Sequence, residues 1–459
     1  LIFNAFSTLF TVPPGPLYFS WPYTILSIVF ALVATVGPAA VICLRILRET
    51  PASAMRPLAP RPGKRTVLER IKPLWSRLSF LHKITARNLL RYKKRGFMTV
   101  LGVAGCTALI FTGFGLHDSL ATIGPKQYDQ IEHYDVAIVF RPTASTEELD
   151  ELFSLVGTAP ELSSYTLNRR ETVDVVGAVL TKNLALIVAG DTEAFPEYFR
   201  MKPRATGLFS ANEPLEFGDG GVIISEQIAH QLDVAVGDTI TLRNLKDEEA
   251  RFEVSGISEN YVYHYVYMTV ATYEQGFGKA FEPNQILGMM SEGFESMPDS
   301  LTGLAAVTGV GYTQKRAADF ADITDVLSFV MIILILSSAA LLFVVLFSLN
   351  TINREERVRE LASIKVLGFL NRELAAYIYR EGIILTVLGI ALGLLFGIAL
   401  ERYLITTIEV DVFMFSRDLL LTSYVYSVLI TAAFAVVINL LLYRPLTRID
   451  MVASLKAIE

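Results

Sequence analysis

The chain has 459 residues, of which 52% are hydrophobic and 19% are charged, and its mean hydropathy is +0.44. An ordinary soluble domain is about 45–50% apolar and about 25% charged, so this composition indicates a membrane protein. It excludes a soluble enzyme, a disordered chain and a nucleic-acid-binding domain.

Uncharged runs predict five membrane spans. Residues 1–44, 96–116, 326–353, 382–400 and 419–443 carry no charged side chain. Each run can supply the helix of about 20 residues that crosses a bilayer. Pro13, Pro14 and Pro16 cannot continue a helix, so the first span is expected to begin near Tyr18.

The charge is distributed unevenly along the chain. Residues 119–322 contain 14 basic and 31 acidic residues, whereas the basic residues elsewhere cluster beside the predicted spans. Because Lys and Arg accumulate in short cytoplasmic loops, the basic clusters are predicted to be cytoplasmic. The acidic segment is then extracytoplasmic, and the chain divides into residues 1–47, 48–95, 96–117, 118–324 and 325–459.

The segment 118–324 mixes helix and strand patterns, which predicts an α+β domain. A helix is expected over 146–156 and another ending near Leu232, with strands over 222–225, 239–242 and 251–257. Before it, residues 48–95 form a basic, proline-containing linker that ends in an amphipathic interfacial helix.

Four tyrosines alternate with other residues late in the outer domain, and they predict a strand with one aromatic face. This face is either packed core, which we favour, or a surface for an extracellular partner. The tyrosines are Tyr261, Tyr263, Tyr265 and Tyr267.

No catalytic or metal-binding constellation emerges from the sequence. Cys43 and Cys106 lie in apolar runs and are interpreted as small packing residues. No GxxxxGK[ST] phosphate loop and no HExxH pair occurs. The predicted spans contain almost no ionisable residues, which disfavours a secondary transporter. His117 and Asp118 stand at a span end, where capping is expected.

One predicted span carries glycines at four-residue spacing, namely Gly389, Gly393 and Gly397. Such a GxxxGxxxG face allows another helix to approach closely, so we expect tight helix pairing within the chain or between subunits.

A charged segment between two spans, residues 353–368, combines charged and apolar residues at helical spacing. It is either a docking helix for a cytoplasmic partner or a passive interfacial helix. Its candidate contact residues are Arg354, Glu355, Arg357, Arg359, Glu360, Leu361, Ile364, Lys365, Leu367 and Gly368.

The two ends of the chain show a weak internal repeat at an offset of 400 residues. Arg48 corresponds to Arg448, Met55 to Leu455 and Arg56 to Lys456. The same offset superposes the first predicted span on the last one, so residues 1–47 are expected to be the last outside loop and span of a first unit.

At these motifs the chain resembles the FtsX-like, or MacB-like, permeases of ABC systems, the mechanotransmission class. Residues 356–368, with the sequence ERVRELASIKVLG, are similar to a family pattern, and Arg380-Glu381 follows. Residues 222–226, 236–240 and 254–257 resemble the periplasmic core of the same proteins, and residues 86–89 resemble its start.

The resemblance implies that residues 353–368 are a coupling helix for a separate dimeric cytoplasmic ABC ATPase, which binds Mg-ATP. This chain itself is expected to need no cofactor and to be no enzyme. The other implied partners are a second permease unit, in the same polypeptide or another chain, and the lipids of a bacterial cytoplasmic membrane. Three functions remain open: export of an amphiphile, peptide or lipoprotein; mechanical activation of an extracellular cell-wall hydrolase or sensor; and an ATPase-independent receptor or adhesin.

Overall fold

The structure is a computed structural model that describes residues 20–48, 93–177, 181–204, 213–355, 370–409 and 413–447, and the single residues 83, 87, 365, 366 and 368. The chain forms two units, residues 1–93 and 94–459. In the first unit, α2 (Trp21–Leu47) is a helix whose described side chains are almost all exposed and apolar, with proline in its first turn and Pro38 inside it.

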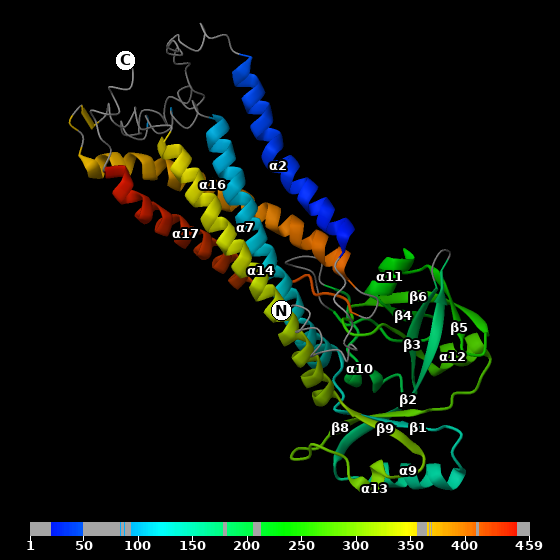
Figure 1. The fold of residues 1–459 in the computed structure, drawn as a ribbon. Helices are drawn as coiled ribbons and strands as arrows, with labels where there is room; N and C mark the ends of the chain where they lie inside the picture. The colour runs from blue at the N-terminus through cyan, green and yellow to red at the C-terminus, as the bar shows by residue number, and fades with distance from the viewer. Residues whose placement is uncertain are drawn as a thin grey trace. The chain divides into compact units, whose positions relative to one another are not determined.

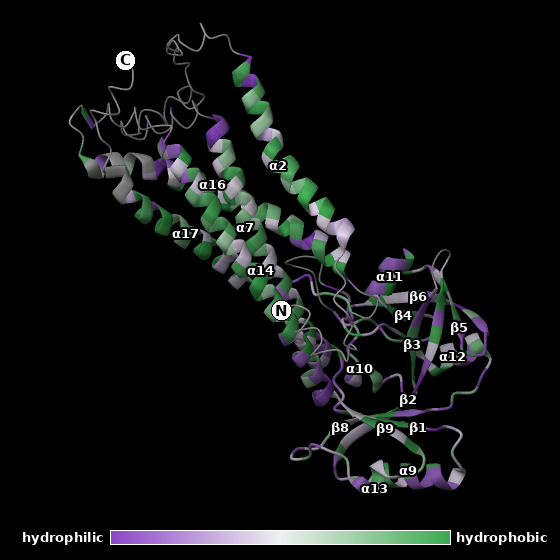
Figure 2. Ribbon diagram, viewed as in Figure 1, coloured by the Kyte–Doolittle hydropathy of each residue, from purple (hydrophilic) through white to green (hydrophobic). Residues whose placement is uncertain are grey.

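Four long helices of the second unit continue the membrane pattern: α7 (Lys93–Ala121), α14 (Thr313–Glu355), α16 (Asn371–Ile408) and α17 (Leu421–Thr447). With α2, five helices are long and apolar enough to cross a membrane. The five predicted spans are thereby confirmed. Hydrophobic residues dominate the middle of these helices, whereas hydrophilic residues gather toward their ends (Figure 2).

Helix α7 is the central helix of the bundle in the second unit. It packs on α14 through Gly102 and Gly113. The hydroxyl oxygen of its Thr107 lies 3.3 Å from that of Thr431 on α17, within hydrogen-bond distance. The glycine face of α16 lies against the opposite side of α7. Small residues at these contacts are typical of a membrane bundle. In a bilayer, close packing between helices stabilises their association, because the hydrophobic effect does not drive it there.

The outer domain is built on a nine-stranded mixed sheet in the order β3-β7-β4-β6-β5-β2-β8-β1-β9. Its strands are β1 (Val136–Phe140), β2 (Leu162–Val176), β3 (Thr181–Ala189), β4 (Val222–Ser225), β5 (Thr239–Asn244), β6 (Glu249–Ser258), β7 (Tyr265–Thr269), β8 (Gln285–Met290) and β9 (Val307–Tyr312). Short helices accompany them: α9 (Thr146–Thr158), α10 (Phe195–Tyr198), α11 (Glu226–Leu232), α12 (Val270–Phe277) and α13 (Asp299–Thr302). The domain and the helical bundle are seen in Figure 1.

The long strand β2 is shared by two lobes. Its second half pairs with both β3 and β5, which closes β3, β7, β4, β6, β5 and β2 into a ring around an apolar core that includes Val188, Ile224 and Val266. Its first half pairs with β8 and belongs to a four-stranded lobe, β2-β8-β1-β9. Helices α9 and α13 cover one face of that lobe and bury Ile138 and Leu152.

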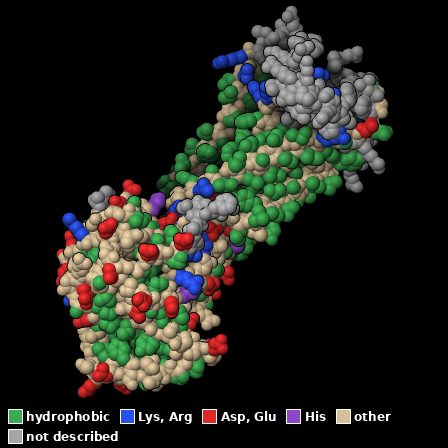
Figure 3. All heavy atoms as spheres, turned by 180° about the vertical axis from the view of Figure 1, so that it is seen from behind, with side chains coloured by type: hydrophobic (Ala, Val, Ile, Leu, Met, Phe, Trp, Pro, Cys, Tyr) green, Lys and Arg blue, Asp and Glu red, His purple; other side chains and the backbone are tan. Residues whose placement is uncertain are grey.

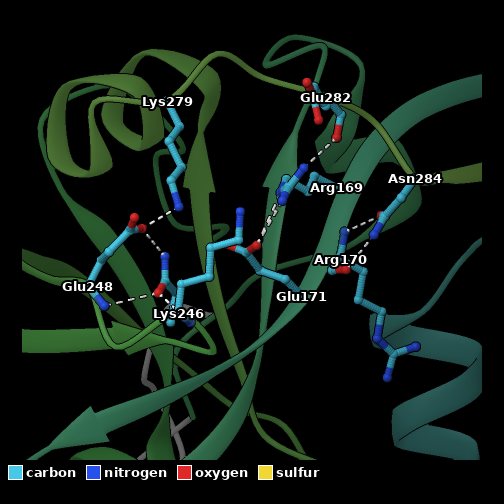
Figure 4. A network of polar contacts seen from close by, with 9 residues as sticks. Arg169, Arg170, Glu171, Lys246, Glu248, Lys279, Glu282 and Asn284 are labelled. Carbon is cyan, nitrogen blue, oxygen red and sulfur yellow. Dashed lines mark hydrogen bonds and ion pairs between the residues drawn. The ribbon is translucent and has the colours of Figure 1, made fainter. Parts of the chain in front are cut away.

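A polar network ties the two lobes together where the chain passes from α12 to β8 (Figure 4). The side chain of Asn284 accepts from the backbone N–H of Arg170 at 2.7 Å and donates to the carbonyl of the same residue at 2.8 Å. Arg169 donates to the carbonyl of Glu282 at 3.0 Å, and Lys279 pairs with Glu248. Asn284 ends the segment between α12 and β8, and Arg170 lies in β2. These bonds therefore hold that segment on the strand that the two lobes share.

Most local predictions in the outer domain match the structure. The predicted helix 146–156 is α9, which begins with a capping box formed by Ser145 and Glu148. The strand predicted over 222–225 is β4, and 239–242 and 251–257 fall in β5 and β6. One boundary differs: α14 begins at Thr313, so the last residues of the predicted segment 118–324 are already part of the helix that enters the membrane.

Candidate functional site: the junction of spans and outer domain

Two helices run from the membrane bundle into the outer domain without a loop. Helix α7 continues through α8 (Ile123–Pro125) into a π-helix, η1 (Lys126–Ile131), and α14 begins at the residue after β9. Pro125 lacks the N–H needed for an ordinary helical bond, which accounts for the change of winding here. π-Helical turns are rare and often mark functional sites. Both connections therefore join the bundle to the outer domain without an intervening loop.

A buried ion pair joins these two connections. The Glu132 carboxylate, 1% exposed, accepts from Arg316 Nη2 on α14 at 2.7 Å. It also accepts from the Tyr134 hydroxyl at 2.9 Å and from Gln127 Nε2 at 2.8 Å. Arg316 additionally stacks on the Tyr128 ring, with 5.6 Å between the guanidinium carbon and the ring centroid. A buried carboxylate is tolerated because several donors surround it.

Gln127 ties η1 to the segment that precedes β7. Its side-chain oxygen accepts from the backbone N–H groups of Tyr261 and Val262 at 2.9 and 3.1 Å. Its Nε2 also donates to Asn260 Oδ1 at 3.1 Å. The side chains of Gln127 and Asn260 are buried and cannot bond to water, so their polar atoms are satisfied by these hydrogen bonds within the protein.

The outer loop between α16 and α17 docks on the same segment. Val262 forms a bridge with Phe413, and the Met414 N–H donates to the Tyr261 carbonyl at 3.0 Å. Lys126 of η1 pairs with Asp418 in this loop. Three separate parts of the bundle, namely η1, α14 and this loop, therefore hold one edge of the outer domain.

Asp118 of α7 caps helix α17. Its Oδ2 accepts from the Leu420 N–H at 3.1 Å and from the Ser423 hydroxyl at 2.5 Å. A carboxylate at a helix N-terminus satisfies free N–H groups and favours the helix dipole. The predicted capping role of this residue is thus seen, with α17 as the capped helix.

Burial also sets the protonation of the junction tyrosines. Removal from water raises the pKa of Tyr261 and that of Tyr134, and the neighbouring carboxylates Glu259 and Glu132 raise them further. Both hydroxyls stay protonated, so Tyr261 donates to Glu259 at 2.9 Å and Tyr134 donates to Glu132. These groups therefore hold the junction together by hydrogen bonds and do not act as bases.

The tyrosine strand differs from the prediction. Tyr261, Tyr265 and Tyr267 are buried, and β7 begins only at Tyr265. Tyr263 adopts φ +58 and is 53% exposed, so the regular alternation breaks there. The aromatic face is packed core, and the interpretation of these four residues as a partner surface is wrong for the three buried ones.

The three glycines of α16 stand where α7 comes closest. A Cβ on Gly389 would lie 2.6 Å from Val103, one on Gly393 2.8 Å from the Ala104 carbonyl oxygen, and one on Gly397 2.7 Å from the Phe111 ring. At Gly393 the near neighbour is a backbone oxygen, which cannot move aside, so this spacing requires glycine there. The close helix approach expected from the glycine spacing occurs within the chain.

The cytoplasmic segment 353–368 lies mostly outside the described residues. Glu355 ends α14, the backbone of Arg354 belongs to the same helix, and Lys365 and Gly368 are described, with φ +93 at Gly368. The remaining candidates lie outside the described residues: Arg357, Arg359, Glu360, Leu361, Ile364 and Leu367. Their proposed contact with a partner stays a prediction.

Sequence reasoning missed the junction residues, above all Glu132, Arg316 and Gln127. A charge within a few residues of a span end is common, so neither Glu132 nor Arg316 stands out by itself. One available signal was that Arg316 precedes an uncharged run closely enough to continue the same helix. Across the described residues, no group of three or more His, Cys, Asp or Glu side chains is placed to hold a metal ion.

Fold and junction define a multi-span membrane protein with an extracytoplasmic domain attached through two of its helices. The profile of the MacB-like periplasmic core domain matches residues 97–296, and that of the FtsX-like permease C-terminal domain matches residues 330–451. The chain belongs to the FtsX/MacB-like permeases of the ABC transporter class.

Three similar solved structures are a periplasmic region, an extracellular domain and a domain of a permease protein. The periplasmic region of MacB from Actinobacillus actinomycetemcomitans is 12% identical, with 41% of this chain and 92% of that one covered and a TM-score of 0.26. The extracellular domain of the ABC-type transporter YknZ from Gram-positive bacteria is 10% identical, with 35% and 84% covered and a TM-score of 0.24. A domain of a permease protein from Porphyromonas gingivalis is 11% identical, with 40% and 90% covered and a TM-score of 0.19. No curated protein matches the chain.

Proposed function

We propose that the chain is the permease subunit of an ABC transporter that converts ATP hydrolysis by a separate cytoplasmic ATPase into motion of the outer domain. That motion would serve export or extraction of an amphiphile, peptide or lipoprotein from a bacterial cytoplasmic membrane. The observation that carries the proposal is the pair of direct connections, α7 through α8 and η1 on one side and β9 into α14 on the other, joined by the buried Glu132–Arg316 pair. A domain that only bound ligands would not need two rigid attachments to spans.

Helix geometry supports this role. A tilt of α14 at its cytoplasmic end would displace β9 directly, because no residue separates Tyr312 from Thr313. The Glu132–Arg316 pair would make α7 and α14 move together at their outer ends. Outer-domain motion without transport, as in activation of an extracellular enzyme, would use the same parts.

The decisive experiment uses the complete complex in lipid nanodiscs with its cytoplasmic ATPase. One fluorophore is placed on α9 at Glu147→Cys and a second on the membrane scaffold, so that energy transfer follows outer-domain position. ATP should change the transfer efficiency. Glu360→Ala and Leu367→Asp should abolish both this change and retention of the ATPase, whereas Glu161→Ala, in the outer domain, should alter neither.

The outcomes separate the candidate functions. If the ATPase is retained and the domain moves but no amphiphile, peptide or lipoprotein leaves the membrane, mechanical activation of an external enzyme replaces export. If no ATPase is captured even after cross-linking from residues 354–368, the proposal fails, and an ATPase-independent receptor becomes the better hypothesis.

A further inference from the structure

The outer edge of strand β9 is open. Among the described residues, β9 pairs with β1 on one side, and no strand pairs with its other side. The strand, Val307–Tyr312, contains no charged residue and no proline. Natural proteins usually shield such edges with charges, proline or a covering element, because exposed N–H and C=O groups invite another strand.

A smooth apolar shelf lies beside this edge. Gly309 and Gly311 are paired with Val139 and Ala137 of β1, so the four residues share one face of the sheet. A Cβ on either glycine would meet open space, and Val139 is 37% exposed. Val310, on the opposite face, packs into the lobe core. An incoming strand therefore meets no side chain of β9 on this face.

The lobe that carries this edge is strongly acidic. Residues 135–163 and 284–312 contain nine acidic residues and one basic residue, Arg141. Arg141 is engaged, since its Nη2 donates to the Ala305 carbonyl at 2.6 Å. The acidic residues include Asp135, immediately before β1, and Asp299 on α13, the helix that contacts β9. Figure 3 shows acidic side chains spread over the outer domain, in contrast to the uncharged middle of the bundle.

This charge decides between the possible occupants of the edge. A second copy of the chain would bring an equally acidic lobe against the first, and like charges at close range oppose association. A basic segment is attracted, and an extended backbone can complete the ladder that β9 leaves open. Strand addition draws affinity from main-chain hydrogen bonds and specificity from alternate side chains.

We propose that the free edge of β9 binds an extended, basic segment of an extracytoplasmic partner protein by strand addition. The segment pairs beside β9 in the plane of the sheet. On one face of the sheet it adjoins Gly309 and Gly311, and its Lys or Arg side chains on the other face meet the acidic helices α9 and α13. This site goes beyond the proposed function and needs no ATP. Because β9 leads directly into α14, the bound segment would be held on the strand most directly connected to a membrane span.

The test uses the full chain in nanodiscs of neutral phosphatidylcholine, so that a basic peptide does not bind the lipid. The probe is a fluorescent eight-residue peptide of alternating lysine and threonine, measured by anisotropy at physiological salt. One comparison peptide carries glutamate in place of lysine. Another keeps every lysine but replaces two threonines with proline, which removes ladder donors. We expect both to bind at least tenfold more weakly than the probe.

Paired variants of the shelf distinguish charge from structure. Gly309→Lys with Gly311→Lys should weaken binding of the lysine peptide at least tenfold. Gly309→Thr with Gly311→Thr should change it less than twofold, because threonine is neutral and suits a strand. Leu245→Lys, on the exposed β5–β6 turn, serves as the distant control and should have no effect. Hydrogen exchange of residues 307–312 should slow when the peptide is bound.

Three results would overturn the proposal. Equal binding of the proline peptide would mean that charge alone attracts the probe. Unchanged exchange of residues 307–312 would place the peptide elsewhere. Disulfide-linked dimers of the Thr308→Cys variant that exclude the peptide would show that a second copy covers the edge.

Discussion

The buried pair between Glu132 and Arg316 makes the sharpest prediction. Glu132→Gln keeps the shape of the side chain but leaves Arg316 without its counter-charge, and the new amide must face donors from Gln127 and Tyr134. Removing one member of a buried ion pair costs about 3–5 kcal/mol. Because the Arg316 side chain is 30% exposed, solvent screens its charge, and the lower figure of about 2–3 kcal/mol is expected.

A double-mutant cycle measures this coupling. Arg316→Met should cost more than Glu132→Gln, since it strands the more deeply buried charge. The double variant should recover about 1–3 kcal/mol relative to the sum of the single variants. The assay is hydrogen exchange of the full chain, followed in peptides that cover residues 126–134 and 313–320. The exchange rates there give the free energy of local opening at the junction.

Controls and the refuting result follow from the same assay. Glu249→Gln breaks an exposed ion pair between β6 and Arg243 of β5, so it should leave exchange at the junction unchanged. If the single effects of Glu132→Gln and Arg316→Met add within about 0.5 kcal/mol, the two residues are not coupled. The inference that this pair fastens α7 to α14 would then be incorrect.

Two further predictions test the bundle and the outer domain. Gly393→Val should destabilise the protein by about 1–3 kcal/mol, because its Cβ would lie 2.8 Å from the Ala104 carbonyl oxygen. Gly382→Val, where a Cβ meets open space, should not destabilise it. Thermal melting of the two variants in detergent makes the comparison. Burial and the Arg200 charge lower the pKa of His133, so the unfolded chain, with a pKa of about 6.5, takes up the proton first on acidification. Outer-domain stability should therefore fall as pH drops below that value, and chemical unfolding between pH 7.5 and 5.5 should show a weaker decline for His133→Gln.

The spans and several elements of the outer domain could be predicted because their signals are local. An uncharged run of twenty residues has few alternatives to a membrane helix, and Ser145 with Glu148 predicts the start of α9 from a few neighbouring residues. The outer extension of α14 was missed for a physical reason. Its first turns carry Lys315 and Arg316, and the charged residues from there to Asp325 end the uncharged run but do not end the helix.

The junction could not be predicted because its partners are distant in the chain. Glu132 and Arg316 are separated by 184 residues, and Gln127 bonds to a backbone 134 residues away. Nothing in the neighbourhood of either residue indicates such a partner. The same applies to Tyr263, whose φ of +58 breaks a strand that residue alternation predicts. Register and closure of this sheet depend on strands that meet only after folding.

The length of α14 sets the scale of the movement that it can produce. Its 43 residues rise about 1.5 Å each, so the helix is about 65 Å long. A tilt of only about 5° around its cytoplasmic end would move its outer end by about 6 Å. Under the proposed function, such a long lever would give displacement at the expense of force, so the outer domain would reposition a partner over a distance and exert little force on it.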